Sequence, residues 1–247
     1  AKGNLVYLCT GRSKAEIYDF ILDCGIDGVI GAGGGYVEIG DTMLYHKKVT
    51  KEAVNHMVDY FEANNFDYYV ESNGGLFASK NLVKRLERII YGDIENDLEA
   101  RKRWQRKENH FINALIEGEE LRRDDINKAC FLENPNIPFD DIINEFKNEF
   151  NVIHCTVPMF GDDSGELSVP NIHKANAIET LINHLGIDRK NTYAFGDGMN
   201  DKEMLEYVNV GIAVGNAKEG LKAVADEVTD DITNDGIYNA MKRHNLI

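Results

Sequence analysis

The chain has 247 residues, of which 43% are hydrophobic and only 4 are proline, so its composition is that of a folded protein with a buried core. It carries 42 acidic against 27 basic residues, a net charge of −15. A surface of that sign repels phosphate backbones, which excludes nucleic acid as the main partner. No apolar run approaches the roughly 20 residues of a membrane helix, and the N-terminal residues lack the layout of a signal peptide.

The four cysteines, Cys9, Cys24, Cys130 and Cys155, are spread widely along the chain. Disulfide frameworks and zinc sites use cysteines at short, regular spacings, which this sequence lacks. We therefore expect reduced thiols in a cytoplasmic protein that has no membrane partner.

The N-terminal segment predicts a strand–helix–strand unit. Residues 4–9 are apolar without alternation, as in a strand that is buried on both faces. A helical pattern runs from Ile17 to Cys24 and ends at Gly25, and residues 27–30 can form a second, parallel strand.

The middle of the chain changes to a mixed α+β pattern. The elements expected there are a hairpin of residues 36–39 and 43–45, a helix over 50–64 with Thr50 as N-cap, strands over 66–71 and 75–78, a long charged helical stretch over 81–116, a strand over 128–133, a helix over 139–150 and a strand over 152–157.

From residue 166 onward, helices and strands alternate again. The expected helices cover 174–185, 200–207, 217–225 and 237–244, and the expected strands cover 192–195, 210–214 and 227–229. Alternating segments at both ends predict an α/β fold, a Rossmann-like doubly wound parallel sheet core with an inserted α+β cap domain. We assign residues 1–31 and 164–247 to the core, and residues 32–163 to the cap.

The strongest chemical signal is the string FGDGMND at residues 195–201, between a predicted strand and a predicted helix. Open α/β sheets bind their ligands at the carboxyl ends of the strands. Asp197 and Asp201 offer the hard oxygen ligands that Mg²⁺ prefers. A single Asp at this position is about equally typical of a helix cap and of a functional site, but the whole string favours a functional site.

Two weaker signals lie at other junctions between a strand and a helix. Thr10 and Gly11 follow the first strand, where a hydroxyl and backbone N–H groups can hold a phosphate oxygen. Lys174 begins a helix, where its charge opposes the helix dipole unless an anion such as Asp201 or a phosphate lies nearby. Taken alone, these residues are more typical of a turn and of a solvated side chain, and the neighbouring His173 of a surface histidine.

Taken together, Thr10, Lys174 and the string at 195–201 resemble motifs two to four of the haloacid dehalogenase superfamily of phosphohydrolases. The sequence is most similar to the Cof-type sugar-phosphate phosphatases with a type IIB α/β cap. Further matches to that subgroup are residues 31–36, 166–170, 214–217 and 235–237. The resemblance spans the whole chain and is most specific in its C-terminal third.

The resemblance implies a role for each matching residue. Thr10 would bind the transferring phosphoryl group, and Lys174 would offset the charge on it. Asp197 would be a Mg²⁺ ligand, whereas Asp201 would ligate or support the metal or pair with the lysine, so that Thr10, Lys174 and Asp201 form the catalytic set. The further candidates for contacts with the phosphate or the substrate are Gly11, Arg12 and Asn200.

One family motif has no match in the sequence. The resemblance implies an Asp-x-Asp-Gly-Thr string, which supplies nucleophile and general acid, about 30 residues before Thr10. Only nine residues precede Thr10, and none of them is acidic. We therefore expect about 30 further N-terminal residues that carry the nucleophile on a central strand, between the strands ending at Cys9 and Phe195. Without them, we expect the chain to be inactive and unable to fold as a soluble monomer.

The function that the resemblance implies is Mg²⁺-dependent hydrolysis of a small phosphate monoester through an aspartyl-phosphate. The expected partner is a small phosphorylated metabolite, and the expected state is a monomer or weak dimer. One alternative is an inactive module that binds a phosphorylated metabolite. Another is transfer of the phosphoglycomutase type, which the large cap disfavours.

Overall fold

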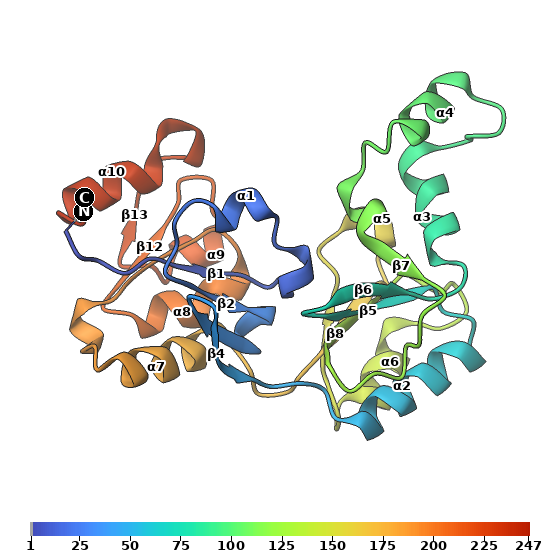
Figure 1. Ribbon diagram of the computed structural model, residues 1–247, viewed down its shortest axis with the longest axis horizontal. Coiled ribbons are helices and arrows are strands. Elements are labelled where there is room, and N and C mark those ends of the chain that lie inside the picture. The colour runs from blue at the N-terminus through green and yellow to red at the C-terminus, as the bar shows by residue number, and fades with distance from the viewer. Residues whose placement is uncertain (1) are drawn as a thin grey trace. The chain divides into compact units, whose positions relative to one another are not determined.

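A computed structural model describes residues 2–247, and the chain divides into two compact units. Unit 1 comprises Ala1–Gly11, Leu22–His46 and Ile172–Ile247, and unit 2 comprises Arg12–Ile21 and Lys47–Asn171. In Figure 1, unit 1 therefore combines blue N-terminal elements with orange and red C-terminal ones. The helices within residues 2–247 are all too short or too polar to cross a bilayer.

Unit 1 contains two sheets. The first has the order β1-β2-β3-β4, with strands Tyr7–Cys9, Gly28–Gly31, Tyr36–Ile39 and Thr42–His46. The second has the order β11-β12-β13, with strands Tyr193–Gly196, Val210–Ala213 and Glu227–Val228. The pair β1–β2 and all pairs of the second sheet are parallel, which confirms the predicted α/β character of both ends of the chain.

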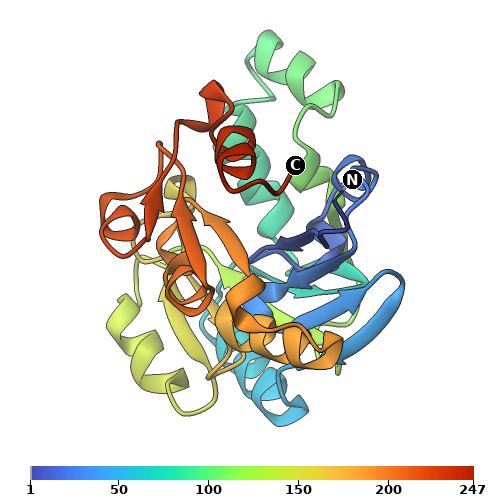
Figure 2. The ribbon, with the colours of Figure 1, turned by 90° about the vertical axis from the view of Figure 1, so that its left-hand side faces the viewer.

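Helix α7 (Lys174–Leu185) joins the two sheets of unit 1 through one apolar core. Its buried apolar residues recur at helical spacing and form a single buried face: Ala175, Ala177, Ile178, Leu181 and Ile182. This face lies in one cluster with Ile30 of the first sheet and Ala194 and Ala213 of the second. The other helices of unit 1 are α8 (Lys202–Tyr207), α9 (Glu219–Lys222) and α10 (Gly236–Arg243), with α10 drawn in red in Figure 2.

Each sheet of unit 1 ends in a strand with one unpaired edge. Among residues 2–247, β1 pairs with β2 alone and β11 pairs with β12 alone. Strands in the interior of a parallel sheet are hydrogen-bonded on both sides, and edge strands leave a row of N–H and C=O groups without strand partners. β1 and β11 are therefore edge strands within the part of the chain that the structure describes.

Unit 2 is built on one six-stranded sheet of order β7-β6-β5-β8-β10-β9. In chain order its strands are β5 (Tyr68–Ser72), β6 (Gly75–Ala78), β7 (Leu115–Glu117), β8 (Ile126–Phe131), β9 (Asn151–His154) and β10 (Gly165–Ser168). Its helices are α2 (Lys51–Ala63), α3 (Leu82–Tyr91), α4 (Leu98–Gln105), α5 (His110–Ala114) and α6 (Phe139–Phe146). Short α1 (Asp19–Leu22) falls at the boundary between the units.

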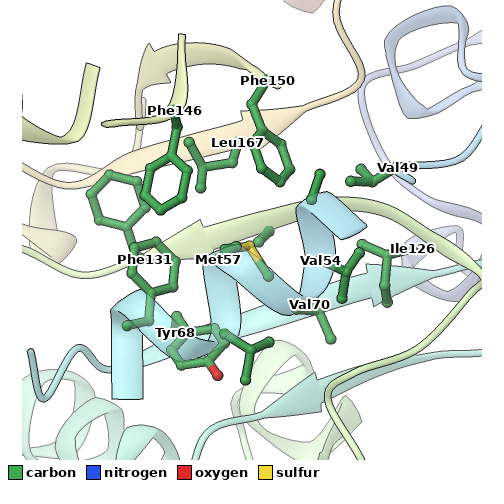
Figure 3. Close-up of a cluster of buried hydrophobic side chains, with 14 of the residues drawn as sticks. Val49, Val54, Met57, Tyr68, Val70, Ile126, Phe131, Phe146, Phe150 and Leu167 are labelled. Atoms are coloured by element: carbon green, nitrogen blue, oxygen red, sulfur yellow. The ribbon is translucent and has the colours of Figure 1, made fainter. Parts of the chain in front are cut away.

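The alternation of side chains along the strands gives this sheet two different faces. On one face, Tyr68, Val70 and Phe131 pack in a large cluster with Phe61 of α2 and Phe146 of α6. Figure 3 shows the aromatic and aliphatic side chains of this cluster between the helix and the strands. Most of the stabilisation of unit 2 by apolar burial is expected from this cluster, since several of its aromatic rings are fully buried.

The opposite face of the sheet has a second apolar cluster. It includes Tyr69 of β5 and Cys130 of β8, the direct neighbours in sequence of residues on the first face, together with Leu82 and Leu86 of α3. This second face also carries the charged residues that are described below.

The observed units differ from the predicted domain boundaries at 31/32 and 163/164. The hairpin β3–β4 extends the first sheet of unit 1, because β3 pairs with β2. Strand β10 lies in the sheet of unit 2, because it pairs with β8 and β9. Residues 12–21, assigned to the core from sequence, belong to unit 2.

The helical stretch predicted over residues 81–116 is not continuous, because the chain forms three separate helices there and enters strand β7 at Leu115. Gly92 has a φ of 85°, a left-handed value that ends α3. The side chains of Asp97 and Asn109 accept backbone N–H groups at the starts of α4 and α5, so each begins a new helix.

The predicted helix from Ile17 to Cys24 is also wrong in extent. The structure has a 3₁₀ turn over Lys14–Glu16 and then the four-residue helix α1. Ser13 precedes this turn, but its hydroxyl donates to Oε2 of Glu71 (2.9 Å) and does not cap it. The other predicted elements are present, some of them shorter than expected.

We predict that Phe61→Ala destabilises the protein by about 3–5 kcal/mol, because it removes a fully buried ring from the centre of the unit 2 core. The exposed Glu52 of the same helix is the control, and Glu52→Ala should change the free energy of unfolding by less than about 0.5 kcal/mol. Urea unfolding measures both. Equal effects of the two variants would contradict this description of the core.

Candidate functional site

A buried ion pair lies at the start of α7. Nζ of Lys174 donates to Oδ1 of Asp201, and both residues are only 5% exposed. Lys174 is the first residue of α7, and Asp201 ends the 3₁₀ turn Met199–Asp201 that follows β11. A buried ammonium at a helix N-terminus is unfavourable without a counter-charge, and the carboxylate supplies it. Asp201 is thus the anionic partner that we expected for Lys174 from its position at the start of a helix.

Asp201 also holds the backbone of the loop after β11. Its Oδ2 accepts the N–H groups of Asp197 (3.0 Å) and Gly198 (3.2 Å). A Cβ at Gly196 would lie 2.7 Å from the Cβ of Asp201, so glycine is needed for this close approach. Since both carboxylate oxygens are engaged in the protein, these contacts favour the lysine-pairing role of Asp201 over direct ligation of a metal.

Asp197 lies at the carboxyl end of β11, and its side chain is exposed. Mg²⁺ is commonly held by one or two carboxylates, with water and substrate phosphate completing its coordination. Within residues 2–247, no group of three or more His, Cys, Asp or Glu side chains is arranged to hold a metal ion. Asp197 therefore fits as one Mg²⁺ ligand, and the other ligands have to come from water, substrate or further protein groups.

Thr10 and Gly11 lie beside the loop that follows β11. The N–H of Thr10 donates to the carbonyl of Ile30 (2.8 Å), and its carbonyl accepts the N–H of Gly33 (3.0 Å), so the loop after β2 fixes its backbone. A Cβ at Gly11 would lie 3.8 Å from Nδ2 of Asn200. Unit 1 thus brings together Thr10, Gly11 and Asn200, three of the residues singled out in the sequence.

The loop after β2 also contacts the start of α7. Gly34 has a φ of 106°, and a Cβ there would lie 2.6 Å from the carbonyl oxygen of His173. The ring of His173 caps α7 by accepting the N–H of Asn176 at 3.4 Å. His173 therefore has a structural role as a helix cap.

The thiol of Cys9 lies within electrostatic reach of the ion pair. Burial raises the pKa of Cys9 to about 12, with Lys174 lowering it and Asp201 raising it. Because the thiolate is the reactive form of cysteine, Cys9 is not a nucleophile at neutral pH.

Arg12 belongs to unit 2, whereas Thr10 and Gly11 belong to unit 1. Its guanidinium lies 5.4 Å from the centroid of the Tyr18 ring, and its Nη1 donates to the carbonyl of Glu16 at 3.3 Å. These interactions therefore do not support the predicted role of Arg12 in binding phosphate.

A cluster of charged side chains, not predicted from the sequence, lies on the second face of the unit 2 sheet. Nζ of Lys128 on β8 lies 3.2 Å from Oε1 of Glu71 on β5 and 3.1 Å from Oε2 of Glu166 on β10. Glu71 is completely buried. The available signal was a charged residue within each of two predicted apolar strands, at Glu71 and Lys128.

Glu16 adds a third carboxyl group to this cluster. Burial and the charge of Glu71 raise the pKa of Glu16 to about 8, and Lys128 offsets part of the shift. The Glu16 carboxyl therefore keeps its proton at neutral pH.

The comparisons with known proteins agree with this fold and its strand-end residues. Residues 1–241 match the family model described as haloacid dehalogenase-like hydrolase, so the chain belongs to this family of hydrolases. It is 27% identical to "Phosphatase YwpJ" of Bacillus subtilis (strain 168) over 260 residues, which cover 96% of this chain and 86% of that protein. This relative supports phosphatase activity.

Two solved structures are similar over the whole chain. A hypothetical protein from Geobacillus kaustophilus HTA426 has a TM-score of 0.78 and 27% identity, covering 100% of this chain and 87% of that one. The HAD subclass IIB sugar phosphatase BT4131 has a TM-score of 0.71 and 23% identity with the same coverage, which shows a shared fold. The fold that the sequence predicted, an α/β core with a cap of this subclass, is thereby confirmed.

We predict that Lys174→Met destabilises the protein by about 3–5 kcal/mol, because it leaves the Asp201 carboxylate buried without its counter-charge. Asp201→Asn should have a comparable effect. The double variant should lose less than the sum of the two single losses, because each change removes the same interaction. Urea unfolding of all four proteins measures the coupling, and strictly additive effects would contradict the pairing.

We predict that the stability difference between the wild type and Glu16→Gln depends on pH. The raised pKa of Glu16 means that, between about pH 4.3 and pH 8, the folded state binds a proton that the unfolded state has released. The free energy of unfolding of the wild type should therefore fall relative to Glu16→Gln across this range and level off above it. Urea unfolding at pH 5, 6.5, 8 and 9 measures the difference, and a constant value would contradict the raised pKa.

Proposed function

We propose that this protein is a Mg²⁺-dependent phosphatase that hydrolyses small phosphate monoesters, such as sugar phosphates. The observation that carries the proposal is the buried pair of Lys174 and Asp201, which ties the loop bearing Asp197 to the start of α7. The closeness of the Asn200 side chain to Gly11, where an added Cβ would lie 3.8 Å from Nδ2, supports a single site formed with Thr10. We further propose that the enzyme acts in the cytoplasm, as a monomer or weak dimer.

In this proposal, the chain's own residues bind and orient the phosphoryl group. The Thr10 hydroxyl and the Gly11 N–H donate to phosphoryl oxygens, and Asn200 contacts the phosphate or the substrate. Lys174 has N–H donors beyond the one that Asp201 accepts, and its charge stabilises the phosphoryl oxygens as negative charge develops on them. Asp197 would hold Mg²⁺, which when bound offsets charge on the phosphate.

We infer that the nucleophilic aspartate lies on a further strand that pairs with β1 and β11. The unpaired edges of these two strands support this inference, since one parallel strand could satisfy both. Such a strand would end at the same sheet edge as Thr10 and Asp197. Its carboxylate oxygen would form a bond to phosphorus while the bond to the ester oxygen breaks, and the alcohol would leave with a proton from an acid group. Water would then hydrolyse the aspartyl-phosphate to free carboxylate and inorganic phosphate.

The test is phosphate release by the full-length protein from p-nitrophenyl phosphate and a panel of sugar phosphates. Activity should disappear with EDTA and return with added Mg²⁺. Asp197→Asn should lower kcat by about 10²–10³, because it removes the proposed metal ligand. Asp41→Asn is the matched control in the exposed hairpin turn of unit 1 and should leave the activity unchanged.

Binding of phosphate esters without release of phosphate would contradict the proposal and favour an inactive binding module. Transfer of phosphate to a second position of a sugar, without release, would favour the mutase alternative. Activity that is insensitive both to EDTA and to Asp197→Asn would contradict the metal site.

A further inference from the structure

Unit 2 contains a cavity of about 430 Å³ on the second face of its sheet. All residues that line it belong to unit 2. Four aromatic rings, those of Tyr18, Tyr69, Phe111 and Phe160, are part of its walls. Its volume is within the range of pockets that bind small organic molecules.

The charged cluster of unit 2 also lines this cavity. Glu16, Glu71 and Glu166 contribute three carboxyl groups, whereas Lys128 is the ammonium in direct contact with two of them. The hydrogen-bond network behind the cluster is well defined, since Ser13 donates to Glu71 and Asn127 donates to Ser13 (3.0 Å). The Glu71 carboxylate is thus held in position by Ser13 and Lys128, and Glu166 is held by Lys128, before any ligand arrives.

Burial and the charge of Glu71 raise the pKa of Glu16, and both residues line the cavity, so the two carboxyl groups are too close together for both to be ionised easily. A proton on Glu16 relieves this repulsion in the unliganded protein. A cation in the cavity could relieve it equally well, by taking the place of that proton. Aromatic rings attract cations over their faces, so the walls favour the same kind of ligand.

We propose that this cavity binds the ammonium group of a small organic molecule, with Glu16 and Glu166 as its direct counter-charges. The carbon skeleton of the ligand packs against the aromatic walls. When the ammonium binds, Glu16 releases its proton to solvent and becomes a carboxylate. The site lies within unit 2, and the proposal does not rest on the phosphatase activity proposed for unit 1.

Several other groups set the charge that Glu16 meets. The titratable and charged side chains around it are Glu71 and Tyr69 of β5, Lys128 of β8, Glu166 of β10, Arg12 on the preceding loop, and His110 of α5 on the cavity wall. Burial lowers the pKa of Lys128, whereas its acidic neighbours raise it. The acidic neighbours have the larger effect, so the pKa of Lys128 lies well above its ordinary value. Lys128 therefore stays charged, and Glu16 is the group that exchanges a proton.

The test compares two isosteric probes, cyclohexylmethylamine and cyclohexylmethanol. They share the same carbon skeleton, but the first carries an ammonium group and the second a hydroxyl group. Isothermal titration calorimetry of the full-length protein at pH 7, in two buffers of different ionisation enthalpy, gives both the affinity and the number of protons released. The amine should bind at least about tenfold more tightly than the alcohol, because it makes charged hydrogen bonds. Its binding should release close to one proton, since the pKa of Glu16 is about 8.

Two variants and a control make the assignment specific. Glu16→Gln should abolish the proton release and reduce the preference for the amine, and Glu166→Gln should weaken the amine while leaving the proton release in place. Glu52→Gln, on the exposed side of α2, should change neither quantity. Thermal unfolding verifies that each variant is folded.

Equal affinity for amine and alcohol would overturn the proposal. So would an amine affinity that is unchanged in both cavity variants, or the failure of the amine to bind in calorimetry and in a thermal-shift assay alike.

Discussion

The buried contact between Lys174 and Asp201 is the interaction on which the organisation of unit 1 depends. The ammonium and the carboxylate belong to residues that are each only 5% exposed, so water can hardly solvate either charge. Separating the two groups would leave both charges buried and unpaired, which is strongly unfavourable. One belongs to the start of α7 and the other to the loop after β11. The pair therefore ties the helix that bridges the two sheets to the strand end that bears Asp197, and the backbone N–H bonds to Asp201 fix the shape of that loop.

Unit 2 meets a comparable constraint in a different way. The alternation of side chains along β5, β8 and β10 gives the face that carries α2 and α6 an apolar composition. On the other face, the same alternation brings Glu71, Lys128 and Glu166 together. The cost of burying these charges is offset by ion pairing, by hydrogen bonds to Glu71 and by the proton that Glu16 retains. Strand register thus accounts for an apolar core on one face, and for charged side chains beside a second apolar cluster on the other.

The sequence predicted the parts of this structure that depend on local chemistry. The strand-to-helix junctions at Thr10 and at residues 195–201, and the need of Lys174 for an anion, are local features, and the partner of Lys174 was correctly named. The other parts of the structure depend on contacts between residues that are far apart in the sequence. The pairing of β10 with β8 and of β3 with β2 moved both domain boundaries, and the hydroxyl of Ser13 bonds Glu71, 58 positions away, instead of capping the 3₁₀ turn that follows it. The carboxyl cluster was missed because it joins residues from four separate segments.

We propose that phosphate binds at the strand ends of unit 1, next to the buried ion pair. A crystal structure of the full-length protein grown with Mg²⁺ and tungstate, whose anomalous scattering identifies the anion, tests this claim most directly. We expect tungstate within hydrogen-bond distance of the Thr10 hydroxyl and of Nζ of Lys174, with Mg²⁺ on the carboxylate of Asp197. Tungstate bound elsewhere, with Lys174 contacting only Asp201 and no metal on Asp197, would contradict it.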